Sequence, residues 1–383
     1  MKTLIVSDLH LGSISRTDLL RRAEMREALF AELRSADRLV LLGDVLELRH
    51  GPIGEAMAAA REFFEDLGGA LGERELVITA GNHDHALVEP WLEGRSTLPE
   101  PPPLAPEQLI DPAGASPAMG TIAEWVRSRS RGAVRVAYPG LWVRPDVYAT
   151  HGHYLDCHLT IPTLERLSVG VMSRLLRRPA SEFDRVEDYE AMGSPVFAWR
   201  DAVARYTHTG AALNGMATVS AWEALGGASD SDGAGGRRRE RLGARARRTA
   251  LAAGFPLAVT ALNRAGIGPL RSEISAAELR RAGLAAMGEV AARLGLGEAY
   301  VVFGHTHRAG PLEGDAPGEW LGRGGARLVN CGSWTYAGIF LGARAGESPY
   351  WPGGCVVVGE DGPPEVRRLL QDRPREELRP ARR

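Results

Sequence analysis

Residues 75–84 of this chain read ELVITAGNHD, and this stretch decides the fold that the sequence predicts. Leu76 to Ala80 form an apolar, β-branched run typical of a buried strand. Asn82, His83 and Asp84 follow where that strand would end. Polar side chains that follow a buried strand in this way favour an α/β sheet with a site at its carboxyl edge.

The same arrangement of an apolar run and a polar cluster occurs four more times. The runs cover residues 2–7, 38–42, 146–150 and 299–303. The clusters that follow them are Asp8-Leu9-His10, Gly43-Asp44, His151-Gly152-His153 and Gly304-His305-Thr306-His307. Because the strands of one α/β sheet can bring their carboxyl ends to a common edge, we expect residues spread over about 300 positions to form one site.

The side chains in these clusters are carboxylates, an amide and imidazoles, without a thiolate. Such a set of oxygen and nitrogen ligands suits Mn, Fe or Zn better than Ca or a Cys-rich structural Zn site. Seven such side chains are too many for one tetrahedral ion, but they suit two divalent metal ions bridged by one carboxylate. Two ions about 4 Å apart can hold both the attacking and the leaving oxygen of a phosphoryl transfer.

In their order along the chain, the clusters resemble those of the metallophosphoesterase (calcineurin-like phosphoesterase) superfamily. That family's pattern is D-x-H, G-D, G-N-H-D/E, H and G-H-x-H. The resemblance implies an α/β fold, a four-layered α/β/β/α sandwich of two mixed sheets, here with a mainly helical insertion that forms a cap. It also implies a dinuclear metal centre, with Mn favoured and Fe or Zn as alternatives.

The resemblance also implies a role for each site residue. The ligands of the first metal would be Asp8, His10, Asp44 and His307, and those of the second would be Asp44, Asn82, His151 and His305. His83 would protonate the leaving oxygen or stabilise the transition state, and Asp84 would orient the His83 ring. The expected reaction is hydrolysis of a phosphomonoester, phosphodiester or pyrophosphate by a metal-bridging hydroxide.

Each residue also has a structural interpretation. Asp44 could cap a helix and Asn82 could form a turn, and each of these would be the better interpretation of that residue alone. Five clusters in order favour a site. For His50, His85 and His153, a structural histidine remains the favoured interpretation.

Other polar residues near the motifs are weaker candidates. Glu47, Arg49 and Arg308 are expected to support the ligands or to lie at the surface, where they could also meet substrate. Asp156 and His158 stand at the start of the insertion.

Composition limits the function classes. The chain has 383 residues and a formal net charge of −2, so its overall field favours neither nucleic acid nor a membrane. Aromatic residues are 6% of the chain and are not interleaved with arginines, which places a nuclease second among the enzymes. A non-catalytic metal-binding scaffold that uses the insertion for partner or membrane contact is the alternative outside the enzymes. Three cysteines without metal spacing and no amino-terminal targeting pattern favour the cytoplasm.

The motifs divide the chain into a core at 1–154 and 298–370 and an insertion at 155–297. We expect helices at 16–35 and 55–67, a long surface loop at 94–120, and a closing hairpin from 354–358 and 366–370. Residues 371–383 are charged and contain prolines, which favours a disordered tail.

Within the insertion, helices are expected at 159–178, 249–262 and 275–294. Residues 226–248 are a Gly/Ser/Asp stretch followed by seven arginines, as in a flexible linker. An insertion that begins beside His151 should cover the metals. Its apolar faces either pack on each other or hold a hydrophobic group, with arginines facing phosphates or anionic lipid.

A more distant resemblance is to the UDP-2,3-diacylglucosamine pyrophosphatases, which carry a helical insertion at this place. Residues 151–156 and 329–334 are similar to their H-G-x-x-x-D and N-x-G-x-W stretches. Those enzymes typically carry Arg where this chain has His83 and Asp where it has His153. The resemblance implies a lipid-like or nucleotide-linked pyrophosphate as substrate.

Overall fold

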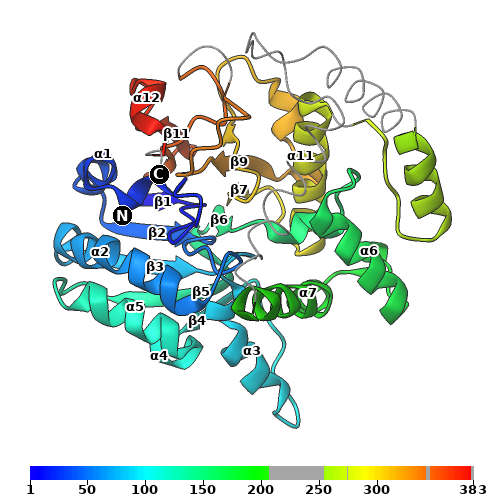
Figure 1. The fold of residues 1–383 in the computed structure, drawn as a ribbon, viewed down its shortest axis with the longest axis horizontal. Coiled ribbons are helices and arrows are strands. Elements are labelled where there is room, and N and C mark those ends of the chain that lie inside the picture. Colours follow the sequence, from blue (N-terminus) through cyan, green and yellow to red (C-terminus); the bar gives the residue numbers. More distant parts are fainter. Residues whose placement is uncertain (207–253, 274, 342–345, 381–383) are drawn as a thin grey trace, which may run out of the picture.

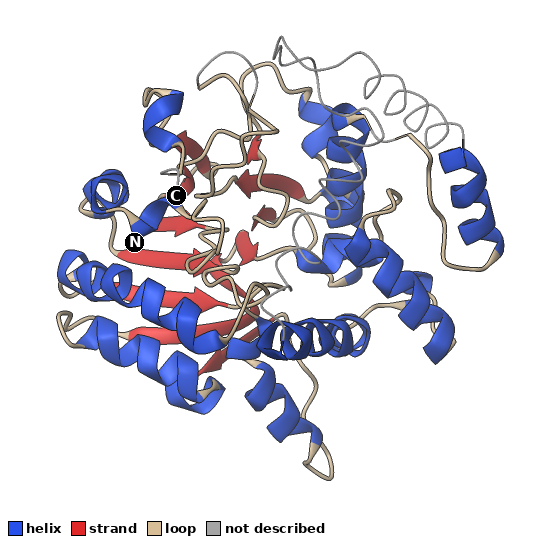
Figure 2. Ribbon diagram, viewed as in Figure 1, coloured by secondary structure: helices blue, strands red, loops and turns tan. Residues whose placement is uncertain are grey.

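The computed structural model of the chain describes residues 1–206, 254–273, 275–341 and 346–380. The strands of this part form one 11-stranded mixed sheet with helices on its outer faces (Figures 1 and 2). The strands are β1 (Thr3–Val6), β2 (Arg38–Leu42), β3 (Glu75–Thr79), β4 (Glu107–Ile110), β5 (Val134–Arg144), β6 (Val147–Thr150), β7 (Tyr300–Phe303), β8 (Ala309–Gly310), β9 (Arg327–Cys331), β10 (Gly354–Val358) and β11 (Glu365–Arg368).

The main helices of the described residues flank this sheet. They are α1 (Ala23–Leu33), α2 (Ile53–Leu71), α3 (Glu89–Ser96), α4 (Pro112–Ala115), α5 (Pro117–Arg127), α6 (Leu164–Leu176), α7 (Val186–Tyr206), a helix at 254–264, α11 (Ala276–Arg293) and α12 (Arg375–Leu378). The helices expected at 16–35 and 55–67 are therefore present as α1 and α2.

The expected sandwich of two separate sheets is wrong. Hydrogen bonds run without interruption through the order β11-β10-β1-β2-β3-β5-β6-β7-β9-β8, with β4 paired to β5. The connection is β5, which pairs in parallel with β3 through Val134 to Val136 and antiparallel with β6 through its second half. The strand patterns could not reveal this join, because an apolar run does not indicate which strand lies beside it.

The sheet curls until its two ends approach each other, which makes it barrel-like and nearly closed. At the seam, a Cβ added to Gly354 of β10 would lie 2.1 Å from the carbonyl oxygen of Cys331 in β9. Only glycine permits this approach. Val40 and Val302 belong to one apolar cluster on the inside, although they lie on parallel blocks, β1-β2-β3 and β6-β7-β9, at different places in the order.

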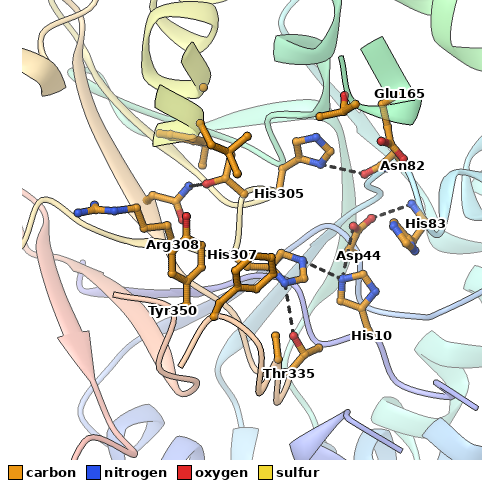
Figure 3. A pocket seen from close by; sticks show the side chains of 18 of the residues that line it. His10, Asp44, Asn82, His83, Glu165, His305, His307, Arg308, Thr335 and Tyr350 are labelled. Carbon is orange, nitrogen blue, oxygen red and sulfur yellow. Dashed lines mark hydrogen bonds and ion pairs between the residues drawn. The ribbon is translucent and has the colours of Figure 1, made fainter. Parts of the chain in front are cut away.

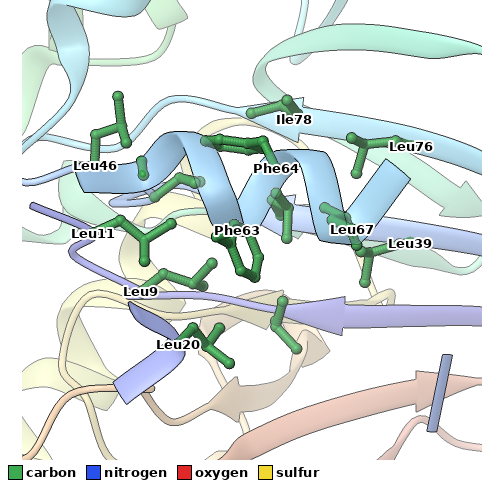
Figure 4. Packing of buried hydrophobic residues seen from close by; sticks show 14 of the residues in the cluster. Leu9, Leu11, Leu20, Leu39, Leu46, Phe63, Phe64, Leu67, Leu76 and Ile78 are labelled. Carbon is green, nitrogen blue, oxygen red and sulfur yellow. The ribbon is translucent and has the colours of Figure 1, made fainter. Parts of the chain in front are cut away.

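The outer face of β1, β2 and β3 is covered by α1, α2 and α5. Figure 4 shows Phe63, Phe64 and Leu67 of α2 packed over Leu39 and the neighbouring strands. Each fully buried side chain of this kind contributes about 1.5–3 kcal/mol. Leu9 and Leu11, on either side of the expected ligand His10, belong to the same cluster. Core packing therefore fixes the loop that follows β1.

A second apolar cluster joins the insertion to the opposite side of the sheet. It contains residues from α6, α7 and α11 together with Val301 and Phe303 of β7. The sequence did not predict α7, which includes Pro195. The expected linker at 226–248, with its arginines, lies outside the described residues.

Three further expectations have different outcomes. The prediction of a long loop at 94–120 is wrong, because β4, α4 and the start of α5 lie in this segment. The hairpin is confirmed, since β10 and β11 pair antiparallel. Residues 371–380, expected to belong to a disordered tail, instead include α12, whose Leu378 is fully buried in the core.

Among the described residues, the structure contains no helix long and apolar enough to cross a membrane.

Candidate metal centre

Loops that follow five strands meet at one place. Asp8 and His10 follow β1, Asp44 follows β2, Asn82 follows β3, His151 follows β6, and His305 and His307 follow β7. The structure thus brings together all seven of the side chains that the sequence suggested as metal ligands.

The backbone at these residues is strained. Seven non-glycine residues of the described part have φ between 47° and 64°. Five of them are expected ligands, namely Asp8, His10, Asp44, His305 and His307. A left-handed residue of this kind costs of order 1–3 kcal/mol and persists only where its surroundings hold it. Strain concentrated on these residues therefore makes this place a candidate functional site.

Backbone hydrogen bonds between the loops hold this strained geometry. The amide of His10 donates to the carbonyl of Asp44 (2.8 Å), and the amide of Asp8 donates to the carbonyl of Gly43 (3.2 Å). The amide of Gly304 donates to the carbonyl of His151 (3.0 Å). The positions of the ligands are thus set by the main chain.

The glycines of the motifs make room for the ligands. A Cβ on Gly81 would lie 2.3 Å from Asp44 Oδ1, and one on Gly304 would lie 2.4 Å from Asp8 Oδ2. Both distances are shorter than any carbon–oxygen contact between non-bonded atoms. Each of these glycines therefore lies where a larger residue would displace a carboxylate.

One group of ligand atoms surrounds Asn82. Asn82 Oδ1 lies 3.2 Å from His151 Nε2 and 3.1 Å from His305 Nδ1, and Asp44 Oδ2 lies 3.2 Å from His151 Nε2. The other nitrogen of each ring already faces an acceptor, Leu42 O for His151 and Asp156 for His305. The inner atoms therefore present lone pairs to one point, which a proton or a metal ion can satisfy.

The other group surrounds Asp8. His10 Nε2 lies 3.3 Å from His307 Nε2, and His307 Nε2 lies 3.2 Å from Asp8 Oδ1. His10 Nδ1 faces Glu47 Oε2 at 3.0 Å, which turns Nε2 inward. Asp8 Oδ1 is buried and accepts no hydrogen bond from the described residues. A buried carboxylate oxygen whose near neighbours are two ring nitrogens fits a cation.

Asp44 belongs to both groups. Its carboxylate lies within 4.8 Å of ligand atoms of His10 and His83, and also of His151 and His305. Buried His/Asp clusters at this place could therefore hold a metal ion.

The charges of the site also favour a bound cation. Burial lowers the pKa of His151, but the Asp44 carboxylate outweighs it and raises that pKa to about 9. Burial likewise opposes a charge on Asp8, yet His307 and His151 hold its pKa at about 2. The carboxylates thus create a negative potential that favours a cation between them.

The structure gives the orienting role to Glu47 instead of Asp84. Asp84 accepts hydrogen bonds from the backbone amides of residues 44, 45, 46 and 81, and among the described residues no hydrogen bond joins its carboxylate to the His83 ring. Both oxygens of Glu47 lie within 3.0 Å of His83 Nδ1. Burial and Arg49 lower the pKa of His83 to about 4, and Glu47 acts in the opposite direction.

Sequence reasoning gave little weight to three residues that now have clear contacts. Glu47 holds both His10 and His83, and its signal was a charged residue in the apolar run after Asp44. Asp156 Oδ2 lies 3.1 Å from His305 Nε2. Asn330, inside β9, donates to the carbonyl of Gly304 (2.8 Å) and to Thr306 Oγ1 (3.0 Å). Its sequence signal was the N-x-G-x-W resemblance, which did not indicate these contacts.

The weaker candidates lie around the centre. His50 Nε2 is 3.7 Å from Glu47, and His85 bonds to Glu190 of α7. Both ring nitrogens of His153 are buried and have no hydrogen-bond partner among the described residues. Arg49 lies over the ring of Phe197, and Arg308 is paired with Asp315.

A cavity of about 480 Å³ opens beside the metal centre (Figure 3). His10, Asp44, Asn82, His83 and His305 line one wall. The cavity also has a large apolar lining, part of it from the insertion. Its apolar residues include Leu155, Leu159, Leu279, Leu284, Phe303, Trp320, Ile339 and Phe340.

No protein-family model matches this chain, and no curated protein matches it either.

Proposed function

We propose that this protein is a metal-dependent phosphoric ester hydrolase of the metallophosphoesterase type. The observation that carries the proposal is the position of Asp44. Its carboxylate lies within reach of both groups of ligand atoms, and His83 stands beside them. This arrangement matches the chemistry that the five ordered motifs predict.

The residues fit two divalent ions, with Mn favoured over Fe or Zn. Asp8, His10, Asp44 and His307 would hold one ion, and Asp44, Asn82, His151 and His305 would hold the other. When bound, two such ions supply Lewis acidity toward phosphoryl oxygens and lower the pKa of bound water.

The protein's own groups position the reaction. Glu47 keeps the proton of His83 on Nδ1, so Nε2 remains as the ring nitrogen available to substrate. His83 lines the cavity, where its Nε2 can donate to the leaving oxygen or to a phosphoryl oxygen once that nitrogen also carries a proton. Asp156 and Asn330 hold the His305 loop, which keeps the ligands in place while substrate binds and product leaves.

The cavity favours a phosphate ester with an apolar part. A cavity of about 480 Å³ is larger than a phosphoryl group needs, and the side chains of Leu284 and Phe340 provide apolar surface beside the polar wall. A lipid-linked or nucleotide-linked ester is consistent with this lining.

The test is hydrolysis of bis-p-nitrophenyl phosphate and p-nitrophenyl phosphate by metal-stripped protein to which Mn, Fe, Zn or Mg is returned. Asp44→Asn is the test variant, and Asp372→Asn, at an exposed position near the carboxyl terminus, is the matched control. We expect metal-dependent turnover in wild type and the control and its loss in Asp44→Asn. Equal turnover in all three proteins would refute the proposal.

A further inference from the structure

A second cavity of about 540 Å³ lies in the insertion, away from the metal ligands. Its lining residues come mainly from α6, the segment at 266–271 and α11. Leu159 is the single residue that lines both this cavity and the one beside the metal centre. The two cavities use different faces of α11, with Leu284 on one side and Ala285 on the other. The second cavity is therefore a separate site and not an extension of the cavity beside the metal ligands.

Arg166 of α6 is the unusual residue of this cavity. It is 4% exposed, and its Nε donates to the carbonyl of Leu159 (2.7 Å). Among the described residues, no carboxylate lies within 4.0 Å of its guanidinium, and none accepts a hydrogen bond from its two terminal nitrogens. Burial lowers the pKa of Arg166, and Cys157 and the more distant Asp156 act in the opposite direction. A Cβ on Gly170, which also lines the cavity, would lie 3.0 Å from Arg166 Nη1. The side chain is thus largely buried, and its terminal nitrogens remain accessible at the cavity.

Similarly buried arginines in this protein do have acidic partners. Arg26 lies 2.6 Å from Asp66, Arg200 lies 2.8 Å from Glu165, and Arg308 is equally close to an aspartate. A buried charge without a partner is costly. This contrast points to an anion that Arg166 binds when a ligand is present.

The rest of the lining is also positive. Arg271 and Arg281 share one acidic partner, Glu278, at 2.8 and 2.9 Å. Arg293 pairs with Glu289 at 2.6 Å. With Arg166, the lining has four arginines and two glutamates, which leaves a surplus of two positive charges. His158 does not add to this surplus, because burial and Arg293 lower its pKa to about 4.

We propose that this cavity binds the phosphate group of a small phosphorylated molecule, with Arg166 as the central contact. A phosphate dianion matches the surplus of two charges, and a guanidinium can bind two of its oxygens at once. The volume exceeds that of a phosphate group, and the remaining wall includes Pro179, Ala180 and Ala282. That neutral wall suits the body of the molecule. The site is independent of the metal centre and of the function proposed for it.

The direct test uses metal-loaded, full-length protein and two probes, inorganic phosphate and phenylphosphonate. The readout is the ¹⁵N-resolved Nε–H signal of Arg166, identified by its loss in Arg166→Lys. Arg74 is the internal reference, because its Nε and both terminal nitrogens donate to backbone carbonyls. We expect a saturable shift at Arg166 and none at Arg74. A shift that grows linearly with phosphate, or equal shifts at both residues, would overturn the proposal.

The two probes distinguish a phosphorylated molecule from free phosphate. If the cavity holds the body of the ligand, phenylphosphonate should bind about tenfold more tightly than phosphate. Equal or weaker binding would remove that part of the proposal and leave a site for the free anion.

Thermal unfolding separates this cavity from the metal centre. Phosphate should raise the unfolding temperature of Asp44→Asn as it does that of wild type, and should have a much smaller effect on Arg166→Gln. If Arg166→Gln does not fold, Arg281→Gln serves instead, because its side chain is half exposed. Loss of the phosphate effect in Asp44→Asn, with retention in the Arg166 or Arg281 variant, would assign the binding to the metal centre and refute the proposal.

Discussion

The two walls of the cavity beside the metal centre are built in different ways. On the core wall, each ligand follows a strand, and backbone hydrogen bonds between loops hold the strained residues, as for His10 and Asp44. On the insertion wall, Leu155 and Leu284 are held by helix packing. The main chain thus fixes the core wall, whereas side-chain contacts fix the position of the insertion.

Several of these side-chain contacts are made by Glu190 of α7. Its carboxylate accepts hydrogen bonds from Tyr138 (2.6 Å) and Ser194 (2.6 Å), and also from Tyr154, and it lies 3.2 Å from His85 Nε2. These partners come from β5, from α7 itself and from the turns that follow Asp84 and Gly152. A single buried carboxylate therefore connects the insertion to two of the ligand loops.

The largest effect is expected for Asp44→Asn, which removes the carboxylate common to both ligand groups. We expect metal-dependent turnover to fall by about a thousandfold or more. Metal content measured on the purified variant should fall as well. A variant that keeps its metal and the wild-type rate would show that Asp44 has no such role.

Gly81→Ala tests whether the core wall is as rigid as its backbone suggests. The new Cβ would meet Asp44 Oδ1 at 2.3 Å, so either the carboxylate or the β3 loop must move. We expect metal affinity, measured by competition with a chelator, to fall by about 10- to 100-fold. Unchanged affinity would mean that this wall adapts more easily than proposed.

Glu47→Gln removes the charge that orients both His10 and His83. We expect kcat to fall by about 10- to 100-fold with little change in KM, because the residue acts through other residues. Glu55→Gln, at an exposed position on α2, is the control and should retain wild-type kinetics. A larger change in KM than in kcat would argue instead for direct contact of Glu47 with substrate.

Glu190→Gln changes the insertion wall. Burial raises the pKa of Glu190, but His85 and the hydroxyl donors outweigh it and hold the pKa at about 2, below the ordinary 4.5. A lowered carboxylate pKa stabilises the fold above pH 4.5, and this contribution, roughly 3 kcal/mol, is lost as the pH falls toward 2.

Thermal or denaturant unfolding across this pH range measures that contribution. Wild type should lose stability between pH 4.5 and 2, and Glu190→Gln should be less stable at neutral pH and show a weaker loss on acidification. Glu182→Gln, at an exposed position in the insertion, should behave as wild type. Identical pH profiles for wild type and Glu190→Gln would show that Glu190 does not hold the insertion in place. The turnover of Glu190→Gln should fall by less than that of Glu47→Gln.

The smallest effect is expected for Gly69→Ala, the matched control for Gly81→Ala. Gly69 lies inside α2 with open space around its Cβ position. Alanine should therefore raise the free energy of unfolding by about 0.5–1 kcal/mol and leave metal affinity unchanged. A loss of affinity here would show that Gly81→Ala does not report on the site alone.

The sequence predicted which residues gather at the candidate metal site better than it predicted the sheet. The ligands lie within a few residues of strand ends, and local patterns of apolar and polar residues indicate such positions. Asn330 was marked only by the N-x-G-x-W resemblance, which did not indicate its contacts with Gly304 and Thr306. Glu190 gave no comparable signal, because its partners outside α7 are 36 or more residues away along the chain. The role of Glu47 was also decided in space, where its carboxylate reaches both His10 and His83.

By itself, then, the sequence determined which segments form the ligand-bearing strands and which residues stand at their ends. The tertiary structure alone decided that β5 joins the strands into one curled sheet, and that α7 packs against the ligand loops through Glu190. The physical reason is that periodicity and residue type report the local environment of a segment. Strand neighbours and side-chain partners depend on contacts between distant parts of the chain, which those local patterns do not encode.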